Sequence, residues 1–179
     1  MPSRSHYEVL GVERTADADR IHEGYLERLN EVHPDRNQGD EDTAHERTIE
    51  VVAAYRVLSD PESRKRYDFR MQNPFCLDGE LPGFGVLKRR NRKEAEERFR
   101  EGAYFLRADD LVKAVEPFKA ALRLEPDYPP AAYNLALVGA LLGSGTFALD
   151  VLAKALVHDP KEPSLLRLRQ AVLETFLAV

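Results

Sequence analysis

The stretch DADRIHEGYLERLNEVHPD, residues 17–35, decides how the first half of the chain folds. Apolar side chains recur within it every three or four residues, at Ile21, Tyr25, Leu29 and Val32. This spacing predicts one amphipathic helix over residues 17–32. A residue that precedes a proline is disfavoured in helical conformation, so the helix should end before His33 and Pro34.

A second apolar pattern follows after a polar loop. Its members again have helical spacing and are Ala44, Thr48, Val51, Tyr55 and Leu58. Thr43 and Glu46 have the spacing of a capping box, which predicts that this helix begins just after Thr43. The two helices should form an antiparallel hairpin. Asp60 as a cap and Pro61 as the first helical residue then predict a short basic helix that ends near Phe69.

Composition limits the functions open to this chain of 179 residues. Hydrophobic residues make up 43% and charged residues 32%, which is typical of a globular protein. The single cysteine, Cys76, rules out a disulfide framework and a zinc site built on cysteine pairs. The net charge of −5 argues against nucleic-acid binding, because such affinity comes from neutralising phosphates.

We expect no cofactor, no bound metal and no catalytic activity. His22, His33 and His45 lack metal-ligand spacing, and no serine or cysteine stands in a recognisable nucleophile–base arrangement. The apolar stretch at residues 131–142 is too short for a membrane span. Because the first residues also contain no apolar leader segment, we expect a cytoplasmic protein without a membrane span.

The second half of the chain contains an internal repeat. Residues 71–90 have prolines and glycines but no apolar period, which predicts a linker, or an irregular packed segment, between residues 1–70 and residues 91–179. Beyond this linker, identical residues recur 34 positions apart, as in Pro126 and Pro160, Ala114 and Ala148, Ala121 and Ala155, and Leu122 and Leu156. Such a period predicts stacked helix-turn-helix units, closed by a terminal helix over residues 163–177.

One motif gives the first half a family resemblance. The tripeptide His33-Pro34-Asp35 lies in the loop between the two predicted helices. It is preceded by YEVLGV at residues 7–12 and followed by AYRVLSD at residues 54–60 and RYD at residues 66–68. In order and spacing, this region resembles the J-domain of the DnaJ family. The resemblance implies a co-chaperone that binds a seventy-kilodalton heat-shock chaperone and stimulates its ATP hydrolysis.

The resemblance also implies which residues bind the chaperone. The essential ones would be His33, Pro34 and Asp35, and the supporting contacts would come from Tyr25, Arg36, Asn37, Arg64, Lys65 and Arg66. The chemistry agrees with this role, because Pro34 stiffens the loop and an exposed Asp35 can accept a charge-assisted bond from an arginine.

The first predicted helix departs from the family in its charge. The family usually has a strongly basic helix here, whereas residues 17–32 contain five acids and two arginines. Like charges would slow encounter with the acidic chaperone surface that the family meets. An alternative therefore stays open, in which the protein is a J-like interaction or adaptor protein that does not stimulate ATP hydrolysis and acts mainly through its repeats.

The repeats resemble a second family. Residues 95–160 are similar to two tetratricopeptide repeats, with signature residues at Gly102, Phe105, Ala114, Phe118, Ala121 and Pro126, and again at Leu135, Ala136, Ala148, Ala155 and Pro160. This resemblance implies a groove for a client or partner protein, lined by Phe99, Ala103, Tyr133, Asn134, Leu137 and Leu141. In the alternative, the protein fills the groove itself, through the J-domain or through Phe75, Leu81 and Phe84 of the linker.

The sequence as a whole predicts an all-α fold. Its first part would be a J-domain, an antiparallel helical hairpin with flanking short helices. Its second part would be a two-repeat tetratricopeptide-like helical stack with a C-terminal capping helix.

Overall fold

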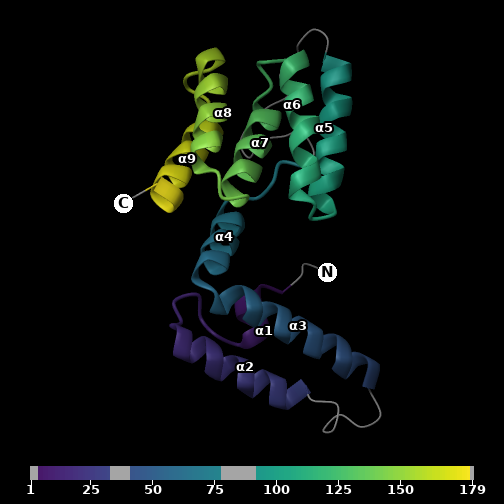
Figure 1. Cartoon of the computed structure of the whole chain (residues 1–179), viewed down its shortest axis with the longest axis vertical. Coiled ribbons are helices and arrows are strands. Elements are labelled where there is room, and N and C mark those ends of the chain that lie inside the picture. Colours follow the sequence, from purple (N-terminus) through teal and green to yellow (C-terminus); the bar gives the residue numbers. More distant parts are fainter. Residues whose placement is uncertain (1–3, 33–40, 78–91, 178–179) are drawn as a thin grey trace. The chain divides into compact units, whose positions relative to one another are not determined.

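The structure is a computed structural model that describes residues 4–32, 41–77 and 92–177 (Figure 1). Within these ranges every regular element is a helix, so the prediction of an all-α fold is confirmed. The chain divides into two compact units, Met1–Asp68 and Phe69–Val179. The two units are described separately below.

The N-terminal unit begins with a short helix, α1 (His6–Leu10), whose first turn is fixed by a capping box. The Ser5 hydroxyl accepts a hydrogen bond from the Glu8 amide at 3.2 Å, and the Glu8 carboxylate accepts one from the Ser5 amide at 2.7 Å. The helix ends at Gly11, which has a left-handed φ of 68°. A short flanking helix was expected, but its cap was not recognised in the sequence.

The predicted hairpin consists of α2 (Ala18–Val32) and α3 (Glu41–Ser59), which lie side by side (Figure 1). The end of α2 at Val32 is where the sequence placed it. The predicted cap of α3 is wrong, because the helix already begins at Glu41. Thr43 therefore lies inside the first turn and has helical conformation, which an N-cap residue does not adopt.

The core of the N-terminal unit joins the first three helices. It contains Tyr7, Val9, Leu10, Ile21, Val51, Ala54 and Leu58. Gly24 lets α2 approach the end of α1 closely, since a Cβ atom at this position would lie 2.6 Å from Val12 Cγ1 and 2.8 Å from the Leu10 carbonyl oxygen. The crossing of α1 and α2 therefore requires a glycine.

The next helix, α4 (Pro61–Gln72), begins at the predicted cap. The Asp60 carboxylate accepts a hydrogen bond from the Ser63 amide at 2.7 Å. The Ser63 side chain first, and this amide second, hold the pKa of Asp60 below its usual value by hydrogen bonding. The helix extends beyond Phe69, where the sequence predicted its end. The boundary between the two units falls within α4, after Asp68.

The C-terminal unit is built from paired helices. They are α5 (Arg92–Arg107), α6 (Leu111–Leu124), α7 (Pro129–Leu141), α8 (Gly145–His158) and α9 (Pro163–Val172), followed by a π-helical turn at Leu173–Leu177. The repeat of the sequence recurs in the helix boundaries: α6 and α8 begin 34 residues apart, and so do α7 and α9. The described helices of this unit are thus repeated helix-turn-helix pairs.

Small residues allow these helices to approach closely. Ala114, Ala121 and Ala148, which recur in the repeat, are all fully buried. A Cβ atom at Gly102 of α5 would lie 2.7 Å from the Phe118 ring of α6. Every residue of α7 is buried, because this helix lies between α6 and α8 (Figure 1). The core of the unit is therefore centred on α7.

Candidate functional site

The predicted chaperone-binding loop cannot be placed. His33, Pro34, Asp35, Arg36 and Asn37 all lie outside the described residues. The helices on either side of them are described, with α2 ending at Val32 and α3 beginning at Glu41. The structure therefore describes the two helices, α2 and α3, that flank this segment.

Tyr25, a predicted supporting contact, lies on α2 and is half-buried against α3. Its ring stacks on the Tyr55 ring, with centroids 4.2 Å apart and an interplanar angle of 16°. The Tyr55 hydroxyl lies 3.0 Å from Nδ1 of His22, one helical turn before Tyr25. This aromatic contact joins the two helices of the hairpin, and it leaves part of the Tyr25 ring accessible to a partner.

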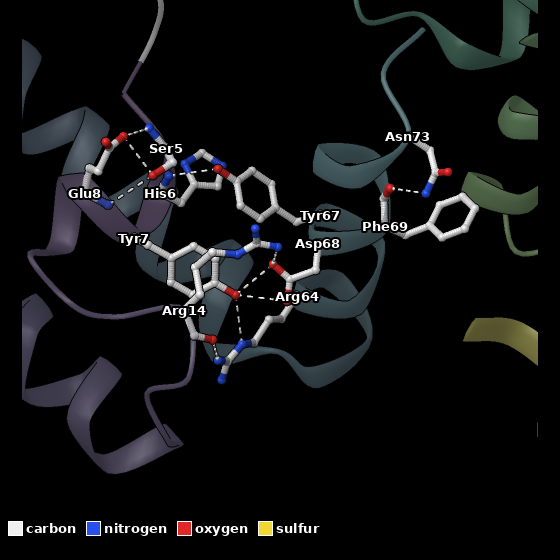
Figure 2. Close-up of polar contacts among 10 residues, drawn as sticks. All are labelled: Ser5, His6, Tyr7, Glu8, Arg14, Arg64, Tyr67, Asp68, Phe69 and Asn73. Carbon is white, nitrogen blue, oxygen red and sulfur yellow. Dashed lines mark hydrogen bonds and ion pairs between the residues drawn. The ribbon is translucent and has the colours of Figure 1, made fainter. Parts of the chain in front are cut away.

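Arg64 is directed into the N-terminal unit (Figure 2). Its Nε donates a hydrogen bond to the Tyr7 hydroxyl at 3.1 Å, and its Nη2 donates to the Arg14 carbonyl oxygen at 2.9 Å. The guanidinium also lies over the Tyr7 ring, 5.6 Å from its centroid. Arg64 therefore positions α4 on α1. Its predicted contact with the chaperone stays a prediction.

Asp68 completes this polar cluster. Its carboxylate accepts a hydrogen bond from the Tyr7 hydroxyl at 2.9 Å and lies 3.6 Å from the Arg14 guanidinium (Figure 2). Burial is the main cause that raises the pKa of Tyr7, so the hydroxyl keeps its proton and remains a donor to Asp68. Sequence reasoning missed Tyr7 and Arg14 as polar partners of Arg64, because they lie 57 and 50 residues from it in the chain.

The two other basic residues predicted on α4, Lys65 and Arg66, are exposed. Both side chains lie on the surface of α4, whereas Arg64 is hydrogen-bonded to Tyr7 and Arg14. The three predicted contacts of α4 therefore separate into one positioning residue and two surface cations.

The surface of α2 remains acidic in the structure. Arg20 lies 3.3 Å from the Glu23 carboxylate and 3.4 Å from that of Glu27, and Arg28 lies 2.7 Å from that of Glu31. Both arginines of this helix are thus paired with acids of the same helix. These exposed pairs contribute little stability, but they leave no basic surface on α2 of the kind that the family usually presents.

The predicted partner groove is assembled but covered. Phe99 and Ala103 lie on α5, and Tyr133, Asn134, Leu137 and Leu141 lie on α7. All six residues are buried, the most exposed being Leu141 at 6%. Burial raises the pKa of Tyr133 to about 12. These residues form part of the core of the C-terminal unit and present no open surface.

The segment that covers them comes from the predicted linker. The Asn134 side chain forms two hydrogen bonds with the backbone of Cys76, accepting from its amide at 2.9 Å and donating to its carbonyl at 2.6 Å. Phe75 and Leu77 pack against the same core. Cys76 thus contacts Asn134, one of the residues predicted to line the groove. Of the linker residues named in the alternative, Phe75 packs against the core of the unit, and Leu81 and Phe84 lie outside the described residues.

The described residues contain no candidate membrane span and no cluster of metal-ligating side chains. Among them, no helix is long and apolar enough to cross a membrane. Nor do three or more histidine, cysteine or acidic side chains gather in that part of the chain in a way that could hold a metal ion.

Comparison with known proteins identifies the N-terminal unit. Residues 5–68 match the family model of the DnaJ domain. These residues form a J-domain. Its helical hairpin is the α2–α3 pair, and the Tyr7–Arg64–Asp68 cluster joins α4 to α1 within it.

The relatives of this J-domain are much longer proteins. The chain is 45% identical to the chaperone protein DnaJ of Desulfitobacterium hafniense over 82 residues. These residues are 46% of the chain and 21% of the length of that relative. Over 68 residues, or 38% of the chain, it is 48% identical to the chaperone protein DnaJ of Acidithiobacillus ferrooxidans, of which it covers 18%. The chain thus spans about a fifth of the length of these curated relatives. No solved structure matches it.

Proposed function

We propose that this protein is a co-chaperone. Its J-domain binds a seventy-kilodalton heat-shock chaperone and stimulates ATP hydrolysis by that partner, and its helical C-terminal unit binds a client or partner protein. The observation that carries the proposal is the match of residues 5–68 to the DnaJ domain, together with the His33-Pro34-Asp35 tripeptide between α2 and α3. The proposed setting is the cytoplasm.

In this proposal the chaperone hydrolyses ATP and the J-domain binds to it. The ATP site belongs to the chaperone, so the J-domain needs no catalytic group of its own. It acts through the His33-Pro34-Asp35 tripeptide between the two helices of the hairpin. Asp35 supplies a carboxylate for an arginine of the chaperone, and Pro34 restricts the backbone beside it.

The acidic surface of α2 narrows the choice of chaperone. A partner with the usual acidic docking surface would be repelled by Glu23 and Glu27, and its rate of encounter would fall. We propose a specialised chaperone whose docking surface is less acidic. The exposed Lys65 and Arg66 on α4 supply the basic contacts that α2 lacks.

The C-terminal unit supports a role in protein binding. Its helix pairs recur with the 34-residue spacing of tetratricopeptide repeats, and modules of that family bind proteins or peptides. Because residues 75–77 cover Asn134 and its neighbours, a peptide can use that surface only by displacing this segment.

A binding measurement tests the partnership. The full chain is immobilised, and the seventy-kilodalton chaperones of its host are passed over it in the presence of ATP. We expect one of them to bind, and His33→Gln to reduce its binding at least about tenfold, as loss of a central contact does. The Glu174→Gln variant, changed at the far end of the chain, should bind like wild type. Equal binding by the His33→Gln variant would contradict the proposal.

A second candidate function is favoured by the acidic surface of α2. In it, the J-domain docks on a partner without stimulating ATP hydrolysis, and the protein acts as an adaptor through its C-terminal unit. Both functions predict that the J-domain binds the chaperone, but they differ in the rate of ATP hydrolysis by that chaperone. Binding that leaves the rate unchanged supports the adaptor, whereas a raised rate supports the co-chaperone.

A further inference from the structure

A groove in the C-terminal unit lies between α6 and α8, over the buried helix α7. It encloses a cavity of about 350 Å³, which is within the size range of protein binding sites. Its apolar lining comes from Leu122 on α6, Leu135 on α7, and Phe147, Val151 and Ala155 on α8. We call it the α6–α8 groove. It is separate from the predicted partner groove on α5 and α7, which residues 75–77 cover.

Cations stand along both sides of the α6–α8 groove. Lys119 and Arg123 line it from α6, and Lys154 lines it from α8 together with His158. Asp150 belongs to this lining, and Glu116 on α6 is paired with Lys119 and Arg123. The three permanent cations exceed these two acids by one charge, in a chain whose net charge is −5. Such a local reversal of sign attracts an acidic partner.

These cations can exchange their present acidic partners for carboxylates of a ligand at a small cost in free energy. Each is paired with an acid on its own helix: Lys119 with Glu116 at 3.0 Å, Arg123 with the same Glu116 at 3.8 Å, and Lys154 with Asp150 at 2.6 Å. The side chains of Arg123 and Lys154 are 66% and 75% exposed. Exposed pairs of this kind are worth at most about 1 kcal/mol each, so carboxylates of a partner can replace Glu116 and Asp150.

The walls of the groove indicate the conformation of its ligand. They extend along α8 from Phe147 to His158, a length of about 16 Å at the rise of an α-helix. Both walls are helices whose backbone amide and carbonyl groups are already bonded within the helix. They cannot satisfy the backbone of an extended peptide, whereas a helical ligand satisfies its own.

We propose that the α6–α8 groove binds an amphipathic helix of a partner protein, whose apolar stripe is flanked on both sides by Asp or Glu. The apolar stripe contacts Leu122, Val151 and Ala155, and the flanking carboxylates contact Arg123 and Lys154. This proposal rests on the proposed function in one respect, namely that the C-terminal unit binds a partner protein. It does not depend on stimulation of a chaperone.

Selection from a peptide library tests the proposal without knowledge of the natural partner. Random 16-residue peptides displayed on phage are selected against the full chain, and each enriched peptide is synthesised and its affinity measured by fluorescence anisotropy. No chaperone is present, so failure here is distinct from failure of the J-domain to bind or stimulate one. We expect enriched peptides with apolar residues at helical spacing and acids on both flanks.

Variants locate the binding site. Arg123→Glu combined with Lys154→Glu should weaken binding at least about tenfold, because contacts to two carboxylates become repulsive. The matched control, Arg98→Glu with Arg100→Glu, changes two exposed arginines of α5 that are likewise paired on their own helix, and it should bind like wild type. Ala155→Arg fills the groove and should abolish binding while the helical circular dichroism is unchanged.

Three results would overturn the proposal. The first is the absence of any enriched peptide. The second is enrichment of peptides without flanking acids. The third is enrichment of acidic peptides whose affinity is the same for wild type, for the double charge reversal in the groove and for Ala155→Arg.

Discussion

The Tyr7 hydroxyl donates a hydrogen bond to the Asp68 carboxylate, with its oxygen 2.9 Å from Oδ1 and 3.0 Å from Oδ2. The same hydroxyl accepts a hydrogen bond from Arg64 Nε at 3.1 Å. One phenol thus joins the first helix of the J-domain to its last, across most of the domain's length in sequence. The position of α4, with Lys65 and Arg66 on its surface, depends on this bond network.

Tyr7→Phe should destabilise the J-domain by about 1–3 kcal/mol, because it leaves Arg64 and Asp68 short of a partner in a partly buried site. Amide hydrogen exchange in α1 and α4 of the full chain measures this effect. Tyr104→Phe removes a hydroxyl from a residue that is 66% exposed and serves as the control. If protection in α1 and α4 falls equally in both variants, the cluster does not have the role described.

Gly24→Ala should also destabilise the J-domain, by about 1–3 kcal/mol, because the added methyl group would overlap Val12 and the Leu10 carbonyl. Amide exchange in α1 and α2 reports the change. Glu23→Ala, at the neighbouring exposed position, should leave protection nearly unchanged, since it adds no contact and alanine favours helix. Wild-type protection in Gly24→Ala would show that α1 and α2 do not approach as closely as described.

The stability of the J-domain should depend on pH through His6. This residue stacks on Tyr67 with ring centroids 4.4 Å apart, and burial lowers the pKa of His6 below the ordinary 6.5, although Glu50 partly opposes this effect. The folded state therefore binds a proton less readily than the unfolded state. The stability from His6 is present above the ordinary value and is lost as the pH falls below it.

The difference between wild type and His6→Gln isolates this contribution. We expect the free energy of unfolding of wild type, relative to that of the variant, to be greatest near pH 7.5 and to decrease towards pH 5.5. Urea denaturation measures this free energy, with amide exchange in the N-terminal unit as the signal. A difference that stays constant across this range, or that increases at low pH, would contradict the assigned sign.

The acidic α2 gives a prediction about partner choice. Glu23→Lys with Glu27→Lys reverses two exposed charges, so it should raise the association rate with a seventy-kilodalton chaperone whose docking surface is acidic, by about tenfold at low ionic strength. Stopped-flow association at two salt concentrations measures this rate. The gain should shrink at high salt because screening weakens exposed charges. A rate that is unaffected by the charge reversal would mean that α2 does not face the chaperone.

Local patterns predicted most of the helices. The apolar spacing of Ile21, Tyr25 and Leu29 is a property of one segment, so the sequence was sufficient to predict α2 and its end before Pro34. The Asp60 cap and the 34-residue recurrence of helix starts are local in the same sense. The start of α3 was predicted wrongly, because the Thr43–Glu46 spacing occurs within the helix as well as at a cap.

The contacts that define the candidate sites could not be predicted, because they are remote in sequence. Arg64 was predicted as a supporting contact to the chaperone, and its hydrogen bond to Tyr7 had no signal in the sequence. Asn134 was predicted to line a groove, but its hydrogen bonds to the backbone of Cys76, 58 residues away, had no signal in the sequence. The α6–α8 groove gave no sequence signal, since its cations are spread over two helices. Pairing between distant segments decides each of these cases.

Stimulation of the chaperone by the J-domain can be measured as single-turnover ATP hydrolysis. The host's seventy-kilodalton chaperone is loaded with ATP, and the hydrolysis rate is measured across a titration of the full chain and of its His33→Gln variant. We predict a rate that rises with the concentration of the wild-type chain to a plateau, and a rate with the variant that stays at the basal value. An unchanged rate with the wild-type chain, for every such chaperone of the host, would contradict the proposed stimulation.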